Sequence, residues 1–278
     1  MTLPCLTDIT ARIQELPAIS GVTLDLLRSL NDGEADIDAL SRRISQDQAI
    51  AARVLRVANS PFYGLQMKVG SLHDAIVVLG FSTVRSLVVA ASVVCALPAT
   101  HCPGFDAARF WRHGVGTAAA AQALARALGR NPDTSFVAGL LHDIGRLVLV
   151  VLLPAEYARL LQQSRQEDRR LVDVEQEVLG FDHAGVGAAL AQRWNFPEAI
   201  REALAYHHQP DPAAGHGLAS LIHYADAIAQ ALDLDEAEDS QMPHLDQAAV
   251  DALGLDRQAL NTLLAETRVR FDSYRLML

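Results

Sequence analysis

Five histidines and two aspartates in this chain could together bind divalent metal ions. Imidazole nitrogens and carboxylate oxygens form a mixed ligand set that suits Mn, Fe, Ni or Zn, or a pair of ions bridged by a carboxylate. Helical bundles build such centres from inward-facing ligands on several helices. The candidate ligands are His113, His142, Asp143, His183, His207, His208 and Asp226.

The pair His142-Asp143 interrupts the apolar stretch FVAGLLHDIGRLVLVVLL, which is predicted to lie in one helix over residues 134–153. A carboxylate buried in such a helix needs a partner or a metal ion. The alternative for Asp143 is a buried ion pair or a helix-end cap, with Arg146 three residues further on as its partner.

A histidine taken alone is usually a surface residue or a hydrogen-bonded core residue. This ordinary interpretation is the one we give to the remaining five. They are His73, His101, His216, His223 and His244.

Helical periodicity dominates the whole chain, and sustained strand alternation is missing from the sequence, so we expect an all-α fold. Asp47, Ser71 and Ser82 are the predicted caps of three helices in the first hundred residues. The expected helices cover 36–58 (two short helices joined at 45–46), 72–80, 83–97, 107–128, 134–153, 155–163, 171–179, 183–194, 197–206, 218–232, 245–252 and 257–276.

A segment with two prolines and no periodic pattern, PATHCP at 98–103, is the predicted boundary between two helical lobes. The N-terminal lobe would cover residues 1–103 and the second lobe residues 104–235. An acidic stretch at 233–241 is expected to be a solvated loop, and residues 236–278 are predicted to form a C-terminal helical extension.

Composition narrows the classes of partner and the compartment. The chain has 278 residues, half of them hydrophobic, and a formal charge of -10, which disfavours binding to nucleic acid or to an anionic membrane. Its longest apolar run, 86–97, is too short to cross a bilayer, and its first residues lack the order of a secretion signal. With three unpaired cysteines, a reducing cytoplasm is the expected location.

The string Gly139-Leu140-Leu141-His142-Asp143-Ile144-Gly145, with His113 upstream and Asp226 downstream, resembles the HD superfamily of metal-dependent phosphohydrolases. Within that superfamily the chain is most similar to the HDOD domain, a bacterial signalling branch, because the first lobe matches as well. The resemblance covers about residues 10–232. The matching stretches are 16–17, 44–47, 53–60, 74–80, 177–197, 207–210 and 225–226.

The resemblance implies a ligand assignment. It gives His113, His142, Asp143 and Asp226 to a first metal ion. It likens His183, His207 and His208 to the further ligands of the two-metal HD-GYP cyclic-dinucleotide phosphodiesterases, with Asp143 as the bridge. One or two ions of Fe, Mn, Ni, Mg or Zn are expected, and they would lower the pKa of a bridging water. Arg146 stands where that branch usually has a lysine, and it is the candidate phosphate-binding residue.

The resemblance also bears on function. HDOD domains are generally regarded as signalling modules without established hydrolase activity, and this chain lacks the GYP-containing segment. We therefore expect an output or relay module of a two-component (response-regulator) or cyclic-di-GMP pathway. It would act by binding a sensor kinase, a receiver domain or a diguanylate-signalling protein, and homo-oligomers are compatible with this role. The alternatives are a metal-dependent phosphohydrolase, and a protein in which metal serves stability or sensing only.

Overall fold

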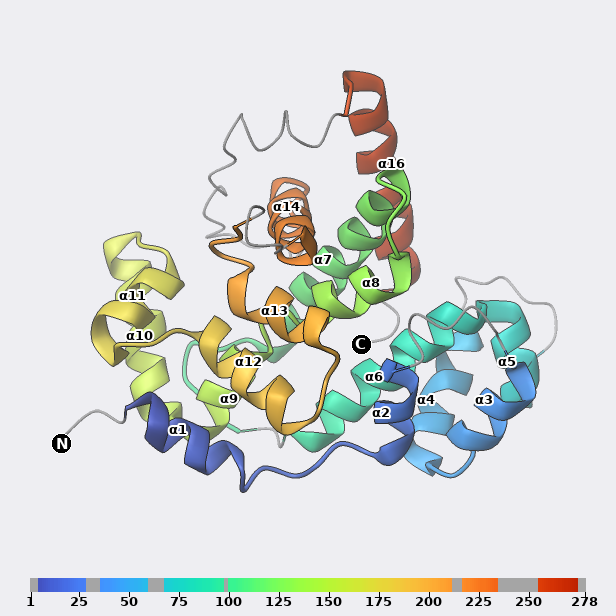
Figure 1. Cartoon of the computed structure of the whole chain (residues 1–278), viewed down its shortest axis with the longest axis horizontal. Coiled ribbons are helices and arrows are strands. Elements are labelled where there is room, and N and C mark those ends of the chain that lie inside the picture. The colour runs from blue at the N-terminus through green and yellow to red at the C-terminus, as the bar shows by residue number, and fades with distance from the viewer. Residues whose placement is uncertain are drawn as a thin grey trace.

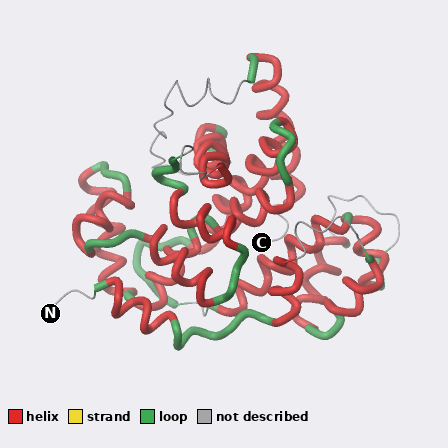
Figure 2. Tube along the Cα trace, in the orientation of Figure 1, coloured by secondary structure: helices red, strands yellow, loops and turns green. Residues whose placement is uncertain are grey.

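The computed structural model describes residues 5–28, 36–59, 68–97, 100–211, 217–234 and 255–274, and all the regular structure in these ranges is helical (Figures 1 and 2). The predicted all-α class is confirmed. The helices are α1 (Leu6–Ile13), α2 (Gly21–Arg28), α3 (Ile37–Ile44), α4 (Gln48–Ala58), α5 (Leu72–Leu79), α6 (Phe81–Ala96), α7 (Ala107–Ala127), α8 (Pro132–Leu141), α9 (Ile144–Leu152), α10 (Pro154–Glu167), α11 (Leu171–Leu179), α12 (His183–Arg193), α13 (Glu198–Tyr206), α14 (Gly217–Ala231) and α16 (Arg257–Tyr274).

Helices α2 to α6 pack against one another and lie together at the lower right of Figure 1. Short polar side chains start several of them: Ser71 accepts a hydrogen bond from Asp74 N at 3.0 Å, and Asp47 accepts one from Ile50 N at 3.1 Å. The prediction of Ser82 as a cap was wrong. Helix α6 begins at Phe81, directly after Gly80, whose φ of 86° turns the chain sharply between α5 and α6.

Helix α7 is the central element of the rest of the molecule, and it packs against α8, α14 and α16. Alanines on α7 make these close contacts possible, since Ala118–Ala121 are fully buried. Helices α9, α12 and α13 continue this packing toward α10 and α11 (Figure 1). The expected helix 245–252 lies outside the described residues, as do His216 and His244.

The single helix expected over 134–153 is instead two helices, and the break falls on the pair His142-Asp143. His142 still has helical angles, whereas Asp143 has φ -94° and ψ 10°, and a tight turn follows in which Arg146 N donates to Asp143 O at 2.9 Å. The break lets both side chains turn toward the same interior point.

Residues before the first expected helix connect the two halves of the molecule. Helices α1 and α2 were not predicted, and α1 packs against α12 and α9. After it, Trp194 Nε1 at the end of α12 donates to Pro17 O at 3.1 Å. The boundaries 1–103, 104–235 and 236–278 stay a prediction.

The apolar segment Pro132–Leu152 has the length and hydropathy of a membrane span, and 83% of its apolar window is buried inside the protein. The bent pair α5 and α6 passes the same test only when taken together, with a 115° bend between them. The first segment is thus a packed interior element of this fold, whereas α5 in the second has an exposed face that includes Val77.

Candidate metal centre

The structure brings all seven candidate ligands together at the meeting point of α7, α8, α9, α12, α13 and α14. They form two groups, and within each group the ligand atoms lie within 4.8 Å of one another. We call the first group the triad, which is His113, His142 and Asp226. We call the second group the tetrad, which is Asp143, His183, His207 and His208.

The triad lies at the edge of the cluster. His113 Nε2 on α7 is 3.1 Å from Asp226 Oδ1 on α14, and these two side chains are 12% and 16% exposed. Gln230 Nε2, one turn further along α14, donates to the same Asp226 oxygen at 2.9 Å. The triad thus contains a hydrogen-bonded histidine–aspartate pair at a partly exposed position.

The tetrad is more deeply buried and centres on one carboxylate oxygen. Asp143 Oδ1 lies 3.1 Å from His183 Nε2 and 3.5 Å from His207 Nε2. His208 Nε2 is 2.8 Å from His183 Nε2. Asp143 also connects the two groups, because the same oxygen is 3.6 Å from His142 Nε2 in the triad.

Backbone carbonyls orient two of the buried imidazoles. His142 Nδ1 lies 2.7 Å from Gly139 O, and His207 Nδ1 lies 2.9 Å from Leu204 O. Because a carbonyl oxygen only accepts hydrogen bonds, Nδ1 of each ring is the donor. In the neutral ring, Nε2 then carries the lone pair and faces the cluster.

The chemistry of this donor set fits a cation. His207 Nε2 is buried without a hydrogen-bond partner, and it faces the Asp143 carboxylate, which also only accepts. Two acceptors that face each other across a buried space are stabilised by a metal ion between them. The 2.8 Å separation of the His183 and His208 nitrogens is close to that of two neighbouring ligands on one ion, since metal–nitrogen bonds are about 2.1 Å long.

Burial and neighbouring charges shift the pKa values within the cluster. Burial lowers the pKa of His142 to about 4, although the Asp143 and Asp226 carboxylates act against it. Burial would also lower the pKa of His183, but the Glu175 and Asp143 charges outweigh burial and raise it to about 10. Without an ion, His183 is therefore protonated at neutral pH and is held between two carboxylates.

The two carboxylates of the cluster stay ionised. Burial acts to raise the pKa of Asp143, but the charges of His142, His183 and Arg146 hold it well below the usual range. For Asp226, burial is opposed by the hydrogen bond and charge of His113, and its pKa is also lowered. Both aspartates therefore offer charged oxygens at neutral pH.

Arg146 lies beside the cluster with a 26% exposed side chain, and its Nη1 is 3.0 Å from Asp143 Oδ2. The ion pair considered for Asp143 from the sequence is thus present. It uses the second carboxylate oxygen and leaves Oδ1 to the histidines. The predicted phosphate-binding role of Arg146 stays a prediction.

Several side chains that position the ligands were missed from the sequence. Glu175 on α11 accepts from His183 Nδ1 at 2.5 Å, and Tyr157 on α10 donates to Glu175 at 2.9 Å. His223, given only an ordinary role, lies with Nδ1 2.8 Å from His207 O and connects α14 to the end of α13. A signal for Glu175 was present, because it lies on the apolar stripe of its helix, four residues before Leu179.

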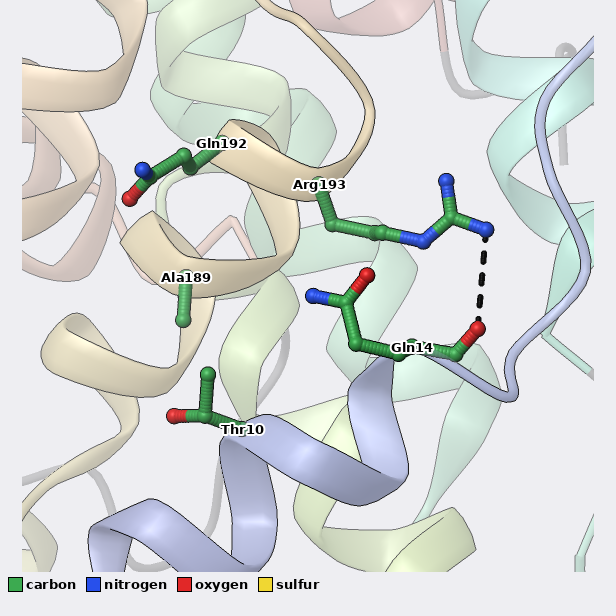
Figure 3. Close-up of a pocket in the computed structure, with 5 residues that line it drawn as sticks. All are labelled: Thr10, Gln14, Ala189, Gln192 and Arg193. Atoms are coloured by element: carbon green, nitrogen blue, oxygen red, sulfur yellow. Dashed lines mark hydrogen bonds between the residues drawn. The ribbon is translucent and has the colours of Figure 1, made fainter.

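A separate polar cavity of about 390 Å³ opens between α1 and α12, and Figure 3 shows its lining. Arg193 Nη2 donates across it to Gln14 O at a long 3.5 Å. The seven ligands do not line this cavity. The lining residues are Thr10, Gln14, Ala189, Gln192 and Arg193.

The helical fold and the buried histidine–aspartate cluster place this chain in the class of all-α proteins with a candidate metal centre. The model of the HDOD domain matches residues 16–210, and the chain belongs to this family. The expected resemblance is confirmed.

Solved structures share the fold over nearly the whole chain. A protein of Shewanella amazonensis SB2B, called a phosphohydrolase by inference, is 32% identical with a TM-score of 0.76, and the match covers 97% of each chain. An HDOD domain protein of unknown function from Geobacter sulfurreducens is 26% identical with a TM-score of 0.74, over 93% of this chain and 87% of that one.

A response regulator from Methylococcus capsulatus is more distant in structure. It is 29% identical with a TM-score of 0.51, over 89% of this chain and 97% of that one. Curated relatives are longer than this chain: it spans 44% of an uncharacterized protein from Treponema pallidum, to which it is 26% identical over 81% of its own length.

Proposed function

We propose that the triad and tetrad bind two divalent metal ions and that this HDOD protein hydrolyses a phosphoester at that centre. One observation carries the proposal: all seven ligands converge, and the buried His207 Nε2 faces a carboxylate with no donor between them. The similarity to the Shewanella protein called a phosphohydrolase agrees with it. The sequence alone favoured a non-catalytic module, and the convergence of the ligands is our reason for proposing hydrolysis instead.

Different residues of this chain would have different roles at the proposed centre. Bound divalent ions supply Lewis acidity and make hydroxide available near neutral pH. Asp143 would face both groups of ligands, since its Oδ1 lies near histidines of each. Arg146 is the partly exposed cation next to them, and it would hold a phosphate oxygen by charge-assisted hydrogen bonds. Substrate would approach over His113 and Asp226, where the cluster is partly exposed.

The experiment uses the whole chain purified without chelators. Metal content is measured first, and then hydrolysis of bis(p-nitrophenyl) phosphate with added Mn²⁺. Asp143→Asn should lose bound metal and at least about 100-fold in rate, because it removes the one charged ligand shared by both groups. Asp173→Asn is the matched control, since the Asp173 side chain is 43% exposed and pairs with Arg170. Two bound ions with no turnover of this diester, or of nucleotide and cyclic-dinucleotide substrates, would reject hydrolysis.

A second candidate function is that of a signalling module in which the metal only stabilises the fold. The similarity to a response regulator over 97% of that chain favours it. In this case the protein would act in the bacterial cytoplasm by binding a sensor kinase, a receiver domain or a diguanylate-signalling protein. It would do so as a monomer or as a homo-oligomer, and it would bind neither nucleic acid nor membrane. Chelation would then lower the melting temperature while no phosphoester is cleaved.

A further inference from the structure

Glu175 is a fully buried carboxylate outside the ligand set. Its Oε2 accepts from both the backbone N of His183, at 2.8 Å, and the ring Nδ1 of the same residue, at 2.5 Å. Its other oxygen, Oε1, accepts from the Tyr157 hydroxyl at 2.9 Å, and Tyr157 is itself fully buried. Both carboxylate oxygens are therefore held, and they hold the first residue of α12 in turn.

This arrangement distinguishes His183 from His142 and His207. Those two rings donate Nδ1 to neutral backbone carbonyls, whereas His183 donates to an anion. A carboxylate behind a metal-binding imidazole fixes its tautomer and raises the electron density on the nitrogen that binds the metal. His183 Nε2 should therefore bind a metal ion more strongly than Nε2 of His142 or His207.

The two groups also differ in what an arriving ion would displace. In the triad, His113 and Asp226 already satisfy each other, Gln230 adds a hydrogen bond, and solvent reaches the pair. The tetrad offers four metal-ligating atoms instead of three, and the buried His207 Nε2 has no hydrogen-bond partner. An ion in the tetrad would replace the proton between His183 and Asp143, which are 3.1 Å apart, and it would also satisfy the buried His207 Nε2, which the triad has no equivalent of.

We propose that Glu175 is a positioning residue that makes the tetrad the tighter of two unequal metal sites, so that the first ion enters the tetrad and the second enters the triad. This inference rests on the proposed metal centre and adds an order of binding to it.

The test is a calorimetric titration of the metal-free whole chain with Mn²⁺ alone. The unaltered protein should show two binding events of different affinity. Glu175→Gln keeps the size and one accepting oxygen but removes the charge, so it should weaken the tighter event by about 10- to 100-fold and leave the weaker event nearly unchanged. Glu177→Gln is the matched control on the same helix, because Glu177 is exposed and pairs with Arg169.

A second measurement does not depend on metal. With ¹⁵N-labelled histidine, the metal-free protein should show one strongly downfield ring proton, which is His183 Nδ1–H bonded to a carboxylate, and Glu175→Gln should shift it upfield. If Glu175→Gln does not fold, Tyr157→Phe replaces it, since it removes one hydrogen bond from Glu175 and should weaken the same event by a smaller factor. Equal weakening of both events, or none, overturns the role of Glu175. Absence of any Mn²⁺ binding by the unaltered protein instead overturns the metal centre itself.

Discussion

The helices α2 to α6 and the helices around the metal-ligand cluster have interiors of different kinds. In the first region the buried residues are mostly aliphatic, and the buried hydroxyls of Thr23 and Ser92 satisfy each other at 2.5 Å. In the second region, histidine and carboxylate side chains fill part of the interior, and His207 Nε2 stays unsatisfied. The first interior consists mainly of apolar packing, and its buried Arg85 pairs with Asp133 of α8. The second interior gathers polar side chains that the proposed cation would complete.

The largest effect on stability and on Mn²⁺ affinity is expected from Gly145→Ala. A Cβ on Gly145 would collide with the carbonyl oxygen of His183 and would lie 2.7 Å from Gly187 N, and these backbone atoms cannot move without separating α9 from α12. The substitution should lower the free energy of unfolding by about 3 kcal/mol or more. It should also move His183 away from Asp143, so Mn²⁺ affinity should fall with it. Denaturant unfolding and Mn²⁺ titration measure the two effects.

Gly185→Ala is the matched control on α12. A Cβ there meets only Asp182 Oδ1, at 3.6 Å, which is an ordinary contact. Because alanine is the better helix former, stability should be unchanged or rise by up to about 1 kcal/mol. If Gly145→Ala is as harmless as Gly185→Ala, then the close approach of α9 and α12 does not set the position of His183.

A smaller effect is expected at the connection between the two regions. Trp194→Phe removes the hydrogen bond from Nε1 to Pro17 O and leaves a small void at a position that is 2% exposed. The cost should be about 1 to 2 kcal/mol in urea unfolding. Metal affinity should hold, because Trp194 is at the opposite end of α12 from His183. Trp111→Phe, at a half-buried position, is the control for the change of ring. A drop in Mn²⁺ affinity with Trp194→Phe alone would mean that this connection influences the geometry of the candidate metal centre.

Helices with a clear apolar stripe were predictable from sequence, and the range 171–179 matches α11 at both ends. The break at His142-Asp143 was not, because a run of apolar residues predicts a continuous helix. The partner of Asp143 on another helix, His183 of α12, is 40 residues away in the sequence and is not visible from local periodicity. Helix α1 was missed for a related reason: it is short, and its buried residues Ile9 and Ile13 pack on distant parts of the chain.

The ligand types and their order were visible in the sequence, but the division into triad and tetrad was not. That division depends on which helices meet, for example α7 with α14 at His113 and Asp226. Glu175 shows most clearly what the sequence could not predict. Its place on an apolar stripe predicts burial, but only the packing of α11 beside the start of α12 reveals that it holds His183.

The smallest effect is expected from Ile76→Val on α5, which removes one buried methylene from the aliphatic region. Stability should fall by about 1 kcal/mol, and Val77→Ala, at a 60% exposed position on the same helix, should change it by less than about 0.5 kcal/mol. Mn²⁺ affinity should equal that of the unaltered protein in both variants. Since Ile76 is far in the fold from any ligand, a change in affinity with Ile76→Val would mean that packing in α2 to α6 sets the geometry of the cluster. The two interiors would then act as one cooperative unit, and the aliphatic region would be part of the metal centre's support.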